Sequence, residues 1–452
     1  MGYASGESGL RAYFAVNGLG LGHIKRCETI AERLIEDGWR VFFSTYLDGY
    51  EYASRRGFKT LRATPISYVV DDKGKVDYKG TLMGNGLSMG FRRALRQVAE
   101  EIRYIKAIRP DLIVSDSRAS TIIAAKLMGL PVILITNQMR VEMTDTLKPK
   151  SMVERIILLL IRFSWFILKH LIEYIWTLSD RIVVPDLPPP YTISNNTLGI
   201  LAYRRRKDIK FIGPLVRRRP GLSHGSMLAG DEPFIYAAVS GPRRERGILA
   251  SKLMKALPEI PEYRFILTKG EPLRGSPAKR MGNLTVYPWI SDEDQLSLLQ
   301  GCRAVICRAG HGMISKALAY GKPMILVPIP NHKEQMENAV RIKELGLGEI
   351  IEQGDLEPST IRRTIKQLLG SNLRGDLLIS RLGDPIEEFL NIIHGTSLRR
   401  SETSRLLMRF RSYIFRSKDV RSPPFKDPLR SALESSPPGF SRTRHLCLNL
   451  LT

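Results

Sequence analysis

The sequence has little cysteine. Its four cysteines stand at positions 27, 302, 307 and 447. No two of them have the CxxC spacing of a zinc site, and their density is far below that of a disulfide-built secreted domain. Residues 1–10 also lack the basic start and apolar run of a signal peptide. We therefore expect a cytoplasmic protein without a metal site or a disulfide framework.

The sequence also lacks an apolar run long enough to cross a bilayer. In its most apolar stretch, residues 152–178, the longest runs without a charge are only six residues, whereas a spanning helix needs about 20. In a helix Arg155, Arg162, Lys169 and Glu173 lie within about 40° of one another and form one narrow charged stripe. The stretch predicts a helix that lies on a membrane surface, and an unusually apolar interdomain or dimer helix is the alternative.

Acidic residues are scarce relative to basic ones, 45 against 69, which gives a net charge of +24. Such a chain attracts phosphate-rich partners, namely nucleic acid, anionic lipid or nucleotide diphosphates. The charge is dispersed and no nucleic-acid-binding module is recognisable, so we expect no nucleic-acid partner. Residues 396–452 are rich in Ser, Arg and Pro and predict a basic disordered tail.

Apolar runs of strand length alternate with helical patterns through most of the chain. A chain of 452 residues exceeds the usual size of one core. The alternation predicts α/β structure with parallel sheets covered on both faces, and it occurs twice. We expect a first Rossmann-like domain over residues 1–200, which includes the apolar helix, and a second over residues 201–395.

The first candidate site is the glycine-rich sequence GLGLGH at residues 18–23, between a predicted strand and a predicted helix. Gly20 and Gly22 allow a ligand to approach the backbone, and the helix amino terminus favours negative charge. The spacing differs from the dinucleotide pattern GxGxxG, and Ser44 and Thr45 stand where an acidic residue would bind the ribose. We therefore expect no nicotinamide cofactor, and no other cofactor.

His23 ends this turn at the carboxyl edge of the predicted sheet. An imidazole in that place suits a general base. A capping or packing histidine is the alternative. Asp116 follows a predicted strand and could hydrogen-bond His23 and raise its basicity, or could cap the helix predicted over residues 119–128.

The second candidate site contains CRAGHGMISK at residues 307–316, followed by GKP at 321–323, VP at 327–328 and EQMENA at 334–339. In this order the segments resemble the carboxyl-terminal signature of the MurG-like family 28 glycosyltransferases and the related UDP-glucuronosyltransferases. Together with GLGLGH, the similarity covers roughly residues 11–395. The resemblance implies two Rossmann-like domains that face a crevice, the GT-B arrangement, with His23 as the base and a UDP-sugar donor on the second domain.

The resemblance also implies the donor-binding residues. Arg308 and the glycines after it would meet the diphosphate, Gln335 would bind a sugar hydroxyl, and Trp289 with Ile290 would flank the uracil ring; Trp289 in the core is the alternative. The complete predicted donor set is Gly20, Gly22, Ser240, Gly241, Trp289, Ile290, Arg308, Gly310, His311, Gly312, Lys316, Glu334, Gln335 and Asn338.

Lys316 departs from the family pattern, which has a glutamate there that holds the ribose hydroxyls. Either the ribose is held otherwise, the donor differs, or donor binding has been lost. We expect the ammonium to contact a donor phosphate or a neighbouring carboxylate, because a buried unpaired charge is costly. Asp292-Glu-Asp294 resembles a DxD metal motif, but Ser291 followed by acidic residues is a common helix start, and we assign it no metal.

These residues predict an inverting, metal-independent transferase that moves a sugar, such as N-acetylglucosamine, from a UDP-sugar to a lipid-linked or other glycan acceptor. The expected partners are the donor, the acceptor and the cytoplasmic face of the cell membrane, to which the protein would bind peripherally. Two alternatives stay open, a non-hydrolysing sugar-nucleotide epimerase and a catalytically inactive membrane-bound partner subunit.

Overall fold

The computed structural model of the chain describes most residues between 9 and 397. The described ranges are 9–66, 86–137, 139, 151–194, 209–216, 228, 232–241, 243–271, 277–370 and 383–397. The predicted disordered tail lies outside these residues from position 398 onward.

The first half of the chain forms a parallel sheet of seven strands in the order β3-β2-β1-β4-β5-β6-β7. The strands are β1 (Arg11–Val16), β2 (Arg40–Thr45), β3 (Lys59–Arg62), β4 (Leu112–Asp116), β5 (Ile133–Ile135), β6 (Arg181–Val184) and β7 (Ile209–Phe211). The helices between them are α1 (Gly22–Glu36), α2 (Leu47–Arg55), α4 (Gly86–Ile108), α5 (Ala119–Leu127) and α6 (Met152–Thr177).

The second half forms another seven-stranded sheet, in the order β10-β11-β9-β8-β12-β13-β14. Its strands are β8 (Phe234–Ala238), β9 (Arg264–Thr268), β10 (Lys279–Met281), β11 (Leu284–Tyr287), β12 (Ala304–Cys307), β13 (Met324–Leu326) and β14 (Gly348–Ile350), and only β10 runs antiparallel. Its helices are α9 (Arg243–Ala256), α10 (Asp292–Gly301), α11 (His311–Ala319), α12 (Lys333–Glu344) and α13 (Pro358–Gly370), with short 3-10 turns at Leu257–Glu259 and Gln353–Asp355.

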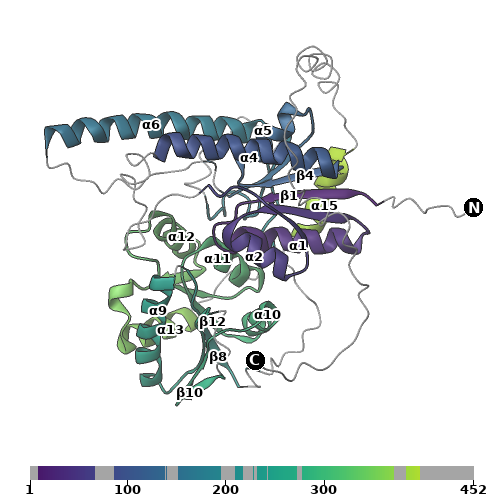
Figure 1. Ribbon diagram of the computed structural model, residues 1–452. Coiled ribbons are helices and arrows are strands. Elements are labelled where there is room, and N and C mark those ends of the chain that lie inside the picture. Colours follow the sequence, from purple (N-terminus) through teal and green to yellow (C-terminus); the bar gives the residue numbers. More distant parts are fainter. Residues whose placement is uncertain are drawn as a thin grey trace, which may run out of the picture.

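Each sheet is buried on both faces, which confirms the predicted α/β architecture used twice (Figure 1). In β1, Phe14 packs into one hydrophobic cluster and the neighbouring Tyr13 into the cluster on the opposite face. This alternation follows from strand geometry, in which successive side chains point to opposite faces. Near-continuous apolar runs are what such doubly covered strands require.

The last described helix, α15 (Pro385–Ser397), returns to the first sheet. Phe389 is fully buried in the same cluster as Ile24 and Ile30 of α1, and Glu387 lies 3.3 Å from the guanidinium of Arg33. Strand β7 also pairs with β6 of the first sheet. Two segments of the range 201–395 therefore belong structurally with the first sheet.

Helix α6 matches the helix expected over residues 152–178. Near its carboxyl end, Ile172, Ile175 and Trp176 pack into the cluster that includes α5. Its amino-terminal end projects beyond the rest of the first unit (Figure 1). In the described part of the chain no helix is long and apolar enough to span a membrane.

The carboxyl ends of the parallel strands carry the turns that the sequence singled out. Ligands of open α/β sheets bind at this edge. In Figure 1, α1 and α2 of the first unit lie beside α10 and α11 of the second. Across this boundary Lys25 donates to Asp292, and Tyr52 donates to the same carboxylate at 3.1 Å. The two predicted site regions thus face a common boundary between the units.

Candidate active site

His23 lies in the first turn of α1 and contacts the carboxylate at the end of β4. Its Nδ1 is 2.7 Å from Oδ1 of Asp116, which is fully buried, while the His23 side chain is 27% exposed. A carboxylate only accepts hydrogen bonds, so in the neutral ring this bond places the proton on Nδ1 and leaves the lone pair on Nε2; Nη2 of Arg26 also lies 3.0 Å from Nδ1. In that tautomer Nε2 can accept a proton from a substrate, as a general base must.

Asp116 is shared with Arg26, a residue that the sequence reasoning missed. Arg26 donates from Nε to Oδ2 and from Nη2 to Oδ1, both at 2.5 Å. Burial alone would raise the pKa of Asp116, but the charges and hydrogen bonds of Arg26 and His23 lower it well below its usual range. The carboxylate is therefore ionised at neutral pH. The helical spacing of residues 23 and 26 was the available signal, since residues three apart share a face.

The helix-cap alternative for Asp116 is wrong. The cap residue of α5 is Arg118, and no side chain caps this helix. Both Asp116 oxygens instead point to α1, where His23, Arg26 and the thiol of Cys27 bind them.

The glycine-rich turn is held tightly by its own surroundings. A Cβ on Gly18 would lie 1.8 Å from the carbonyl oxygen of Tyr46, so only glycine fits there. The amide of Gly20, which was predicted to contact the sugar donor, instead donates a hydrogen bond to the carboxylate of Asp48 at 3.2 Å. A Cβ on Gly22 would meet open space.

The amino terminus of α11 lies at the carboxyl edge of the second sheet. Gly310 is its cap residue in an extended conformation, and no side chain caps the helix. Gly310 is partly exposed and Gly312 is exposed, and Cβ atoms added to either would meet nothing within 4 Å. An uncapped helix terminus of this kind favours an anion, because its amides and the helix dipole supply positive potential.

Arg308 differs from its expected placement against the donor. It is 1% exposed, and its guanidinium donates to the carbonyls of Val327, Pro328 and Glu245 and to Oε1 of Gln353. Burial lowers the pKa of Arg308 to about 10. The Arg308 side chain thus links neighbouring loops of the second unit to one another. In this turn, only the backbone amides are left to contact a diphosphate directly.

Two residues of α12 also support the turns. Asn338 donates to the carbonyl of Ala309 at 3.1 Å, and Oε1 of Gln335 accepts from the amide of Ile329 at 3.0 Å. Both side chains are buried, whereas Glu334 is partly exposed in the first turn of the helix. With its oxygen occupied, Gln335 can recognise a sugar hydroxyl through its NH2 group.

His311 follows Gly310 and crosses to the first unit. Its Nε2 lies 3.3 Å from Oδ2 of Asp186, a buried residue just after β6, and Ser315 lies 3.3 Å from its Nδ1. Burial would raise the pKa of Asp186, but the hydrogen bond from His311 and those around it lower it. This second histidine–aspartate pair connects the turn at Gly310 to the segment that follows β6.

Trp289 and Ile290, which were predicted to flank the uracil ring, lie after β11. Ser240 and Gly241, two further predicted donor-binding residues, lie after β8. Trp289 is 41% exposed, so the core alternative for it is wrong, and the partly buried Ile290 packs on the core of the second unit. Ser240 and Gly241 are exposed, and Gly241 has a φ of +112°, which favours glycine. Both segments leave their sheet at the carboxyl edge that also carries Gly310.

Lys316 contacts two protein groups. One of them is a neighbouring carboxylate, as the sequence predicted. Its ammonium donates to Oε1 of Gln295 at 2.5 Å and lies 4.0 Å from Oδ1 of Asp292. Burial, followed by the charge of Lys25, lowers the pKa of Lys316 to about 8. Ser291 caps α10 by accepting from the amide of Asp294 at 3.0 Å, which confirms the helix-start interpretation of this acidic segment.

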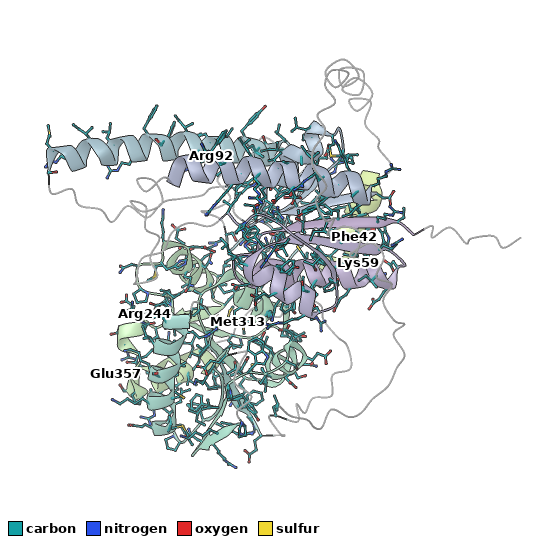
Figure 2. The ribbon with its side chains drawn as sticks, viewed as in Figure 1. Phe42, Lys59, Arg92, Arg244, Met313 and Glu357 are labelled. Atoms are coloured by element: carbon teal, nitrogen blue, oxygen red, sulfur yellow. The ribbon has the colours of Figure 1, made fainter. Side chains whose placement is uncertain are left out.

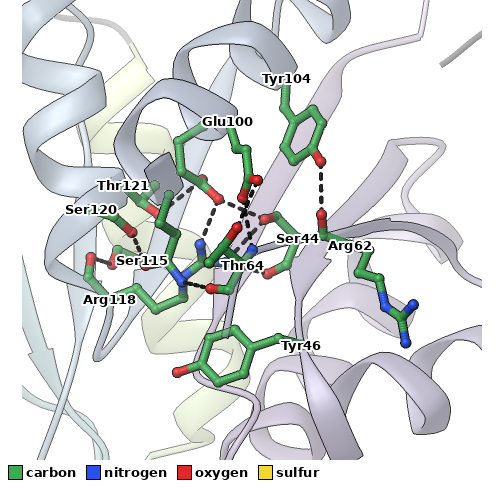
Figure 3. Close-up of polar contacts among 12 residues, drawn as sticks. Ser44, Tyr46, Arg62, Thr64, Glu100, Tyr104, Ser115, Arg118, Ser120 and Thr121 are labelled. Carbon is green, nitrogen blue, oxygen red and sulfur yellow. Dashed lines mark hydrogen bonds and ion pairs between the residues drawn. The ribbon is translucent and has the colours of Figure 1, made fainter. Parts of the chain in front are cut away.

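A buried polar cluster lies at the β4–α5 turn, around Ser115 and Arg118 (Figure 3). Arg118 donates to Oε1 of Glu101 at 2.6 Å, and both side chains are almost completely buried. The hydroxyls of Tyr13, Ser44 and Thr121 donate to the same carboxylate at 2.7–2.9 Å. Arg118 also donates to the carbonyl of Ser44. The cluster fixes the β4–α5 turn, which begins at Asp116.

Comparison with known proteins identifies both units. Residues 279–378 match the glycosyltransferase family 28 C-terminal domain, and residues 10–161 match glycosyl transferase family 1. An uncharacterized glycosyltransferase of Methanosarcina acetivorans is 26% identical over 355 residues, which cover 78% of this chain and 88% of that protein.

One further relative is similar to part of the chain, and one solved structure is similar in fold. The UDP-N-acetylglucosamine--N-acetylmuramyl-(pentapeptide) pyrophosphoryl-undecaprenol N-acetylglucosamine transferase of Sulfurihydrogenibium sp. is 30% identical over 129 residues, 28% of this chain and 35% of the relative. MurG from Acinetobacter baumannii has a similar fold, with a TM-score of 0.53 at 15% identity over 85% of this chain and 99% of MurG.

The two matched regions fall one in each unit, the first over β1 to β5 and the second over β10 to β14. They contain the two glycine turns that the sequence singled out, with His23 in the first match and Gly310 in the second. The chain is therefore a glycosyltransferase with the two-Rossmann-domain GT-B fold, and part of its second unit is similar to the family 28 C-terminal domain.

Proposed function

We propose that the enzyme performs an inverting transfer in which His23 is the base. Nε2 of His23 takes the proton of an acceptor hydroxyl, and the oxygen attacks the anomeric carbon of the donor from the side opposite the leaving group. The bond between that carbon and the diphosphate breaks. Asp116 holds the ring and stabilises the imidazolium that forms, because its carboxylate is buried, ionised and 2.7 Å away.

The leaving nucleoside diphosphate would be stabilised by the amino terminus of α11. This helix offers amides at Gly310 and Gly312, open space above them and a favourable dipole. Fixed amides act on the developing charge without first reorganising. The observation that carries the proposal is the His23–Asp116 pair in the first unit together with this uncapped terminus in the second, where the two units contact each other, because transfer requires both a base and an anion site.

The donor we propose is a UDP-sugar. Support comes from the exposed indole of Trp289 at the same carboxyl edge of the second sheet as Gly310, since an aromatic face can stack on a nucleobase. The partial relative from Sulfurihydrogenibium carries UDP-N-acetylglucosamine in its name, which makes N-acetylglucosamine the first sugar to test.

The donor is tested by incubating the enzyme with a panel of UDP-sugars and with a lipid extract as acceptor. We expect release of UDP and a new sugar-bearing lipid with inverted anomeric configuration, and UDP-N-acetylglucosamine as the most rapidly used donor. A matched incubation without lipid should release little UDP. Conversion of the donor to an epimer without any UDP release would contradict the proposal and favour the epimerase alternative.

We further propose that α6 holds the enzyme on the cytoplasmic leaflet of the membrane, where a lipid-linked acceptor reaches His23 by lateral diffusion. The helix exposes large apolar side chains along much of its length: Met152, Ile156, Leu159, Phe163, Phe166, Ile167, Leu168, Leu171 and Tyr174. Arg155 and Arg162 are exposed among them. A broad apolar face with flanking cations is the pattern of an interfacial helix.

Helix α4 adds to this surface. Phe91 and Leu95 are 66% and 53% exposed on it, together with Arg92, Arg93 and Arg96, and Figure 2 draws Arg92 on the part of α4 below α6. Each cation near an anionic leaflet contributes about 1 kcal/mol of binding free energy. The surface therefore combines apolar insertion with charge attraction, as peripheral membrane binding requires.

Membrane binding is tested by co-sedimentation with liposomes that contain phosphatidylglycerol. The variant Ile156→Ser/Leu159→Ser/Phe163→Ser/Phe166→Ser should stay in the supernatant while the wild type sediments, because the insertion of four apolar side chains is lost. Ile35→Ser/Val340→Ser, which changes exposed apolar residues of α1 and α12, should sediment like the wild type. Equal sedimentation of all three proteins would show that α6 is not the membrane contact.

A further inference from the structure

Two helices of the second unit lie between the proposed nucleobase site at Trp289 and the proposed diphosphate site at Gly310. Trp289 precedes α10, Gly310 precedes α11, and the two helices are in contact. A nucleoside diphosphate that stacks on Trp289 and places its diphosphate at Gly310 must lay its ribose across this contact. The polar side chains there are Asp292 and Gln295 of α10 and Lys316 of α11.

Asp292 is the one carboxylate in this trio. Its side chain is 41% exposed, so a ligand can reach it. Oδ1 accepts from Lys25 and Oδ2 accepts from Tyr52, both residues of the first unit. Burial would raise the pKa of Asp292, but Lys25 and Lys316 lower it, so the group is ionised at neutral pH.

The carboxylate retains capacity for a further ligand. Two carboxylate oxygens offer about four lone-pair sites, and the two contacts from the first unit use one on each oxygen. Lys316 cannot serve as an acceptor, since an ammonium only donates. Its bond to Gln295 uses one of the two lone pairs of that carboxamide oxygen, and a neutral amide oxygen is a weaker acceptor than a carboxylate. Hydroxyl protons of a ribose therefore have one strong acceptor here, Asp292.

We propose that Asp292 is the specificity-determining residue that accepts the ribose hydroxyls of the donor nucleotide, with Lys316 as the positioning residue that holds α10 and α11 at this spacing. The inference rests on the proposed function, since it requires a nucleoside diphosphate donor. It explains how a site with lysine at position 316 can still recognise ribose. Because Lys25 binds the same carboxylate, ribose recognition and the contact between the two units meet at one side chain.

The test compares UDP with 2′-deoxy-UDP by calorimetric titration of the wild type and three variants. In the wild type we expect UDP to bind about tenfold more tightly, the factor that corresponds to roughly 1.4 kcal/mol for hydrogen bonds to a charged acceptor. Asp292→Asn should bind both nucleotides equally, because the amide is a weaker acceptor and is free to turn its NH2 group toward the ligand. Lys25→Met, which keeps the carboxylate, should retain the preference for UDP.

Glu293→Gln is the matched control, since it removes one negative charge from the same turn of α10, and it should also retain the preference. If Asp292→Asn keeps the wild-type preference for UDP, or if the wild type shows none, the inference is wrong while nucleotide binding and transfer stand. If the wild type binds neither nucleotide, the proposed UDP-sugar donor is wrong, and the inference with it.

Discussion

His23→Ala should lower the rate of sugar transfer by roughly 10²-fold to 10⁴-fold, the usual cost of losing a general base. The affinity for UDP should change little, because we propose that the donor binds the second unit at Gly310 and Trp289 and not the unit that carries His23. The measurement pairs kcat for transfer with the dissociation constant of UDP. A fall in kcat without a change in binding is the signature of an interaction made in the transition state.

Two further variants sharpen this experiment. Asp116→Asn keeps the shape of the side chain but offers its amide to Nδ1 of His23, so it should lower kcat while UDP binding persists. Glu36→Gln, at the last residue of the same helix α1, serves as the control and should retain full activity. Wild-type rates for His23→Ala would mean that His23 is a packing residue, the alternative that its sequence position left open.

Glu101→Gln should destabilise the first unit by about 3–5 kcal/mol, because it leaves the buried guanidinium of Arg118 without its counter-charge. The hydroxyls of Tyr13, Ser44 and Thr121 would also lose a charged acceptor. For a unit of this size the loss corresponds to a fall of roughly 6 to 20 °C in Tm. Thermal unfolding followed by circular dichroism measures it.

Arg96→Ala is the matched control for this prediction. Arg96 pairs with Glu100 on the same helix α4 at 3.2 Å, but its side chain is 75% exposed. Exposed pairs of this kind contribute at most about 1 kcal/mol, because water screens them. The Tm should therefore fall by less than roughly 4 °C. Equal Tm values for the two variants would show that the Glu101 cluster does not stabilise the fold.

Local sequence patterns determined the architecture. Ten strands of the two sheets match apolar runs of the sequence, at residues 11–18, 39–45, 111–115, 132–136, 181–185, 234–240, 263–268, 284–287, 304–307 and 324–328. The strand-to-helix turns after β1 and β12 lie where the glycines predicted them. These features follow from short-range physics, since strand burial, helix amphipathicity and glycine turns are each encoded within a few neighbouring residues. The four short strands β3, β7, β10 and β14 were not predicted, because edge strands of three or four residues carry little periodic signal.

The tertiary structure alone decided which polar groups meet. Asp116 pairs with both His23 and Arg26 across 90 residues or more of chain, and Arg308 turns beneath its loop to bind carbonyls instead of facing the donor. The contact of Asp292 with Lys25 spans 267 residues and two units. No local pattern encodes such partners, because burial, and not sequence spacing, determines which charges must find one another. The sequence thus predicted the glycine turns at the ends of the strands, whereas the packing of the two units decided which side chains contact one another at those turns.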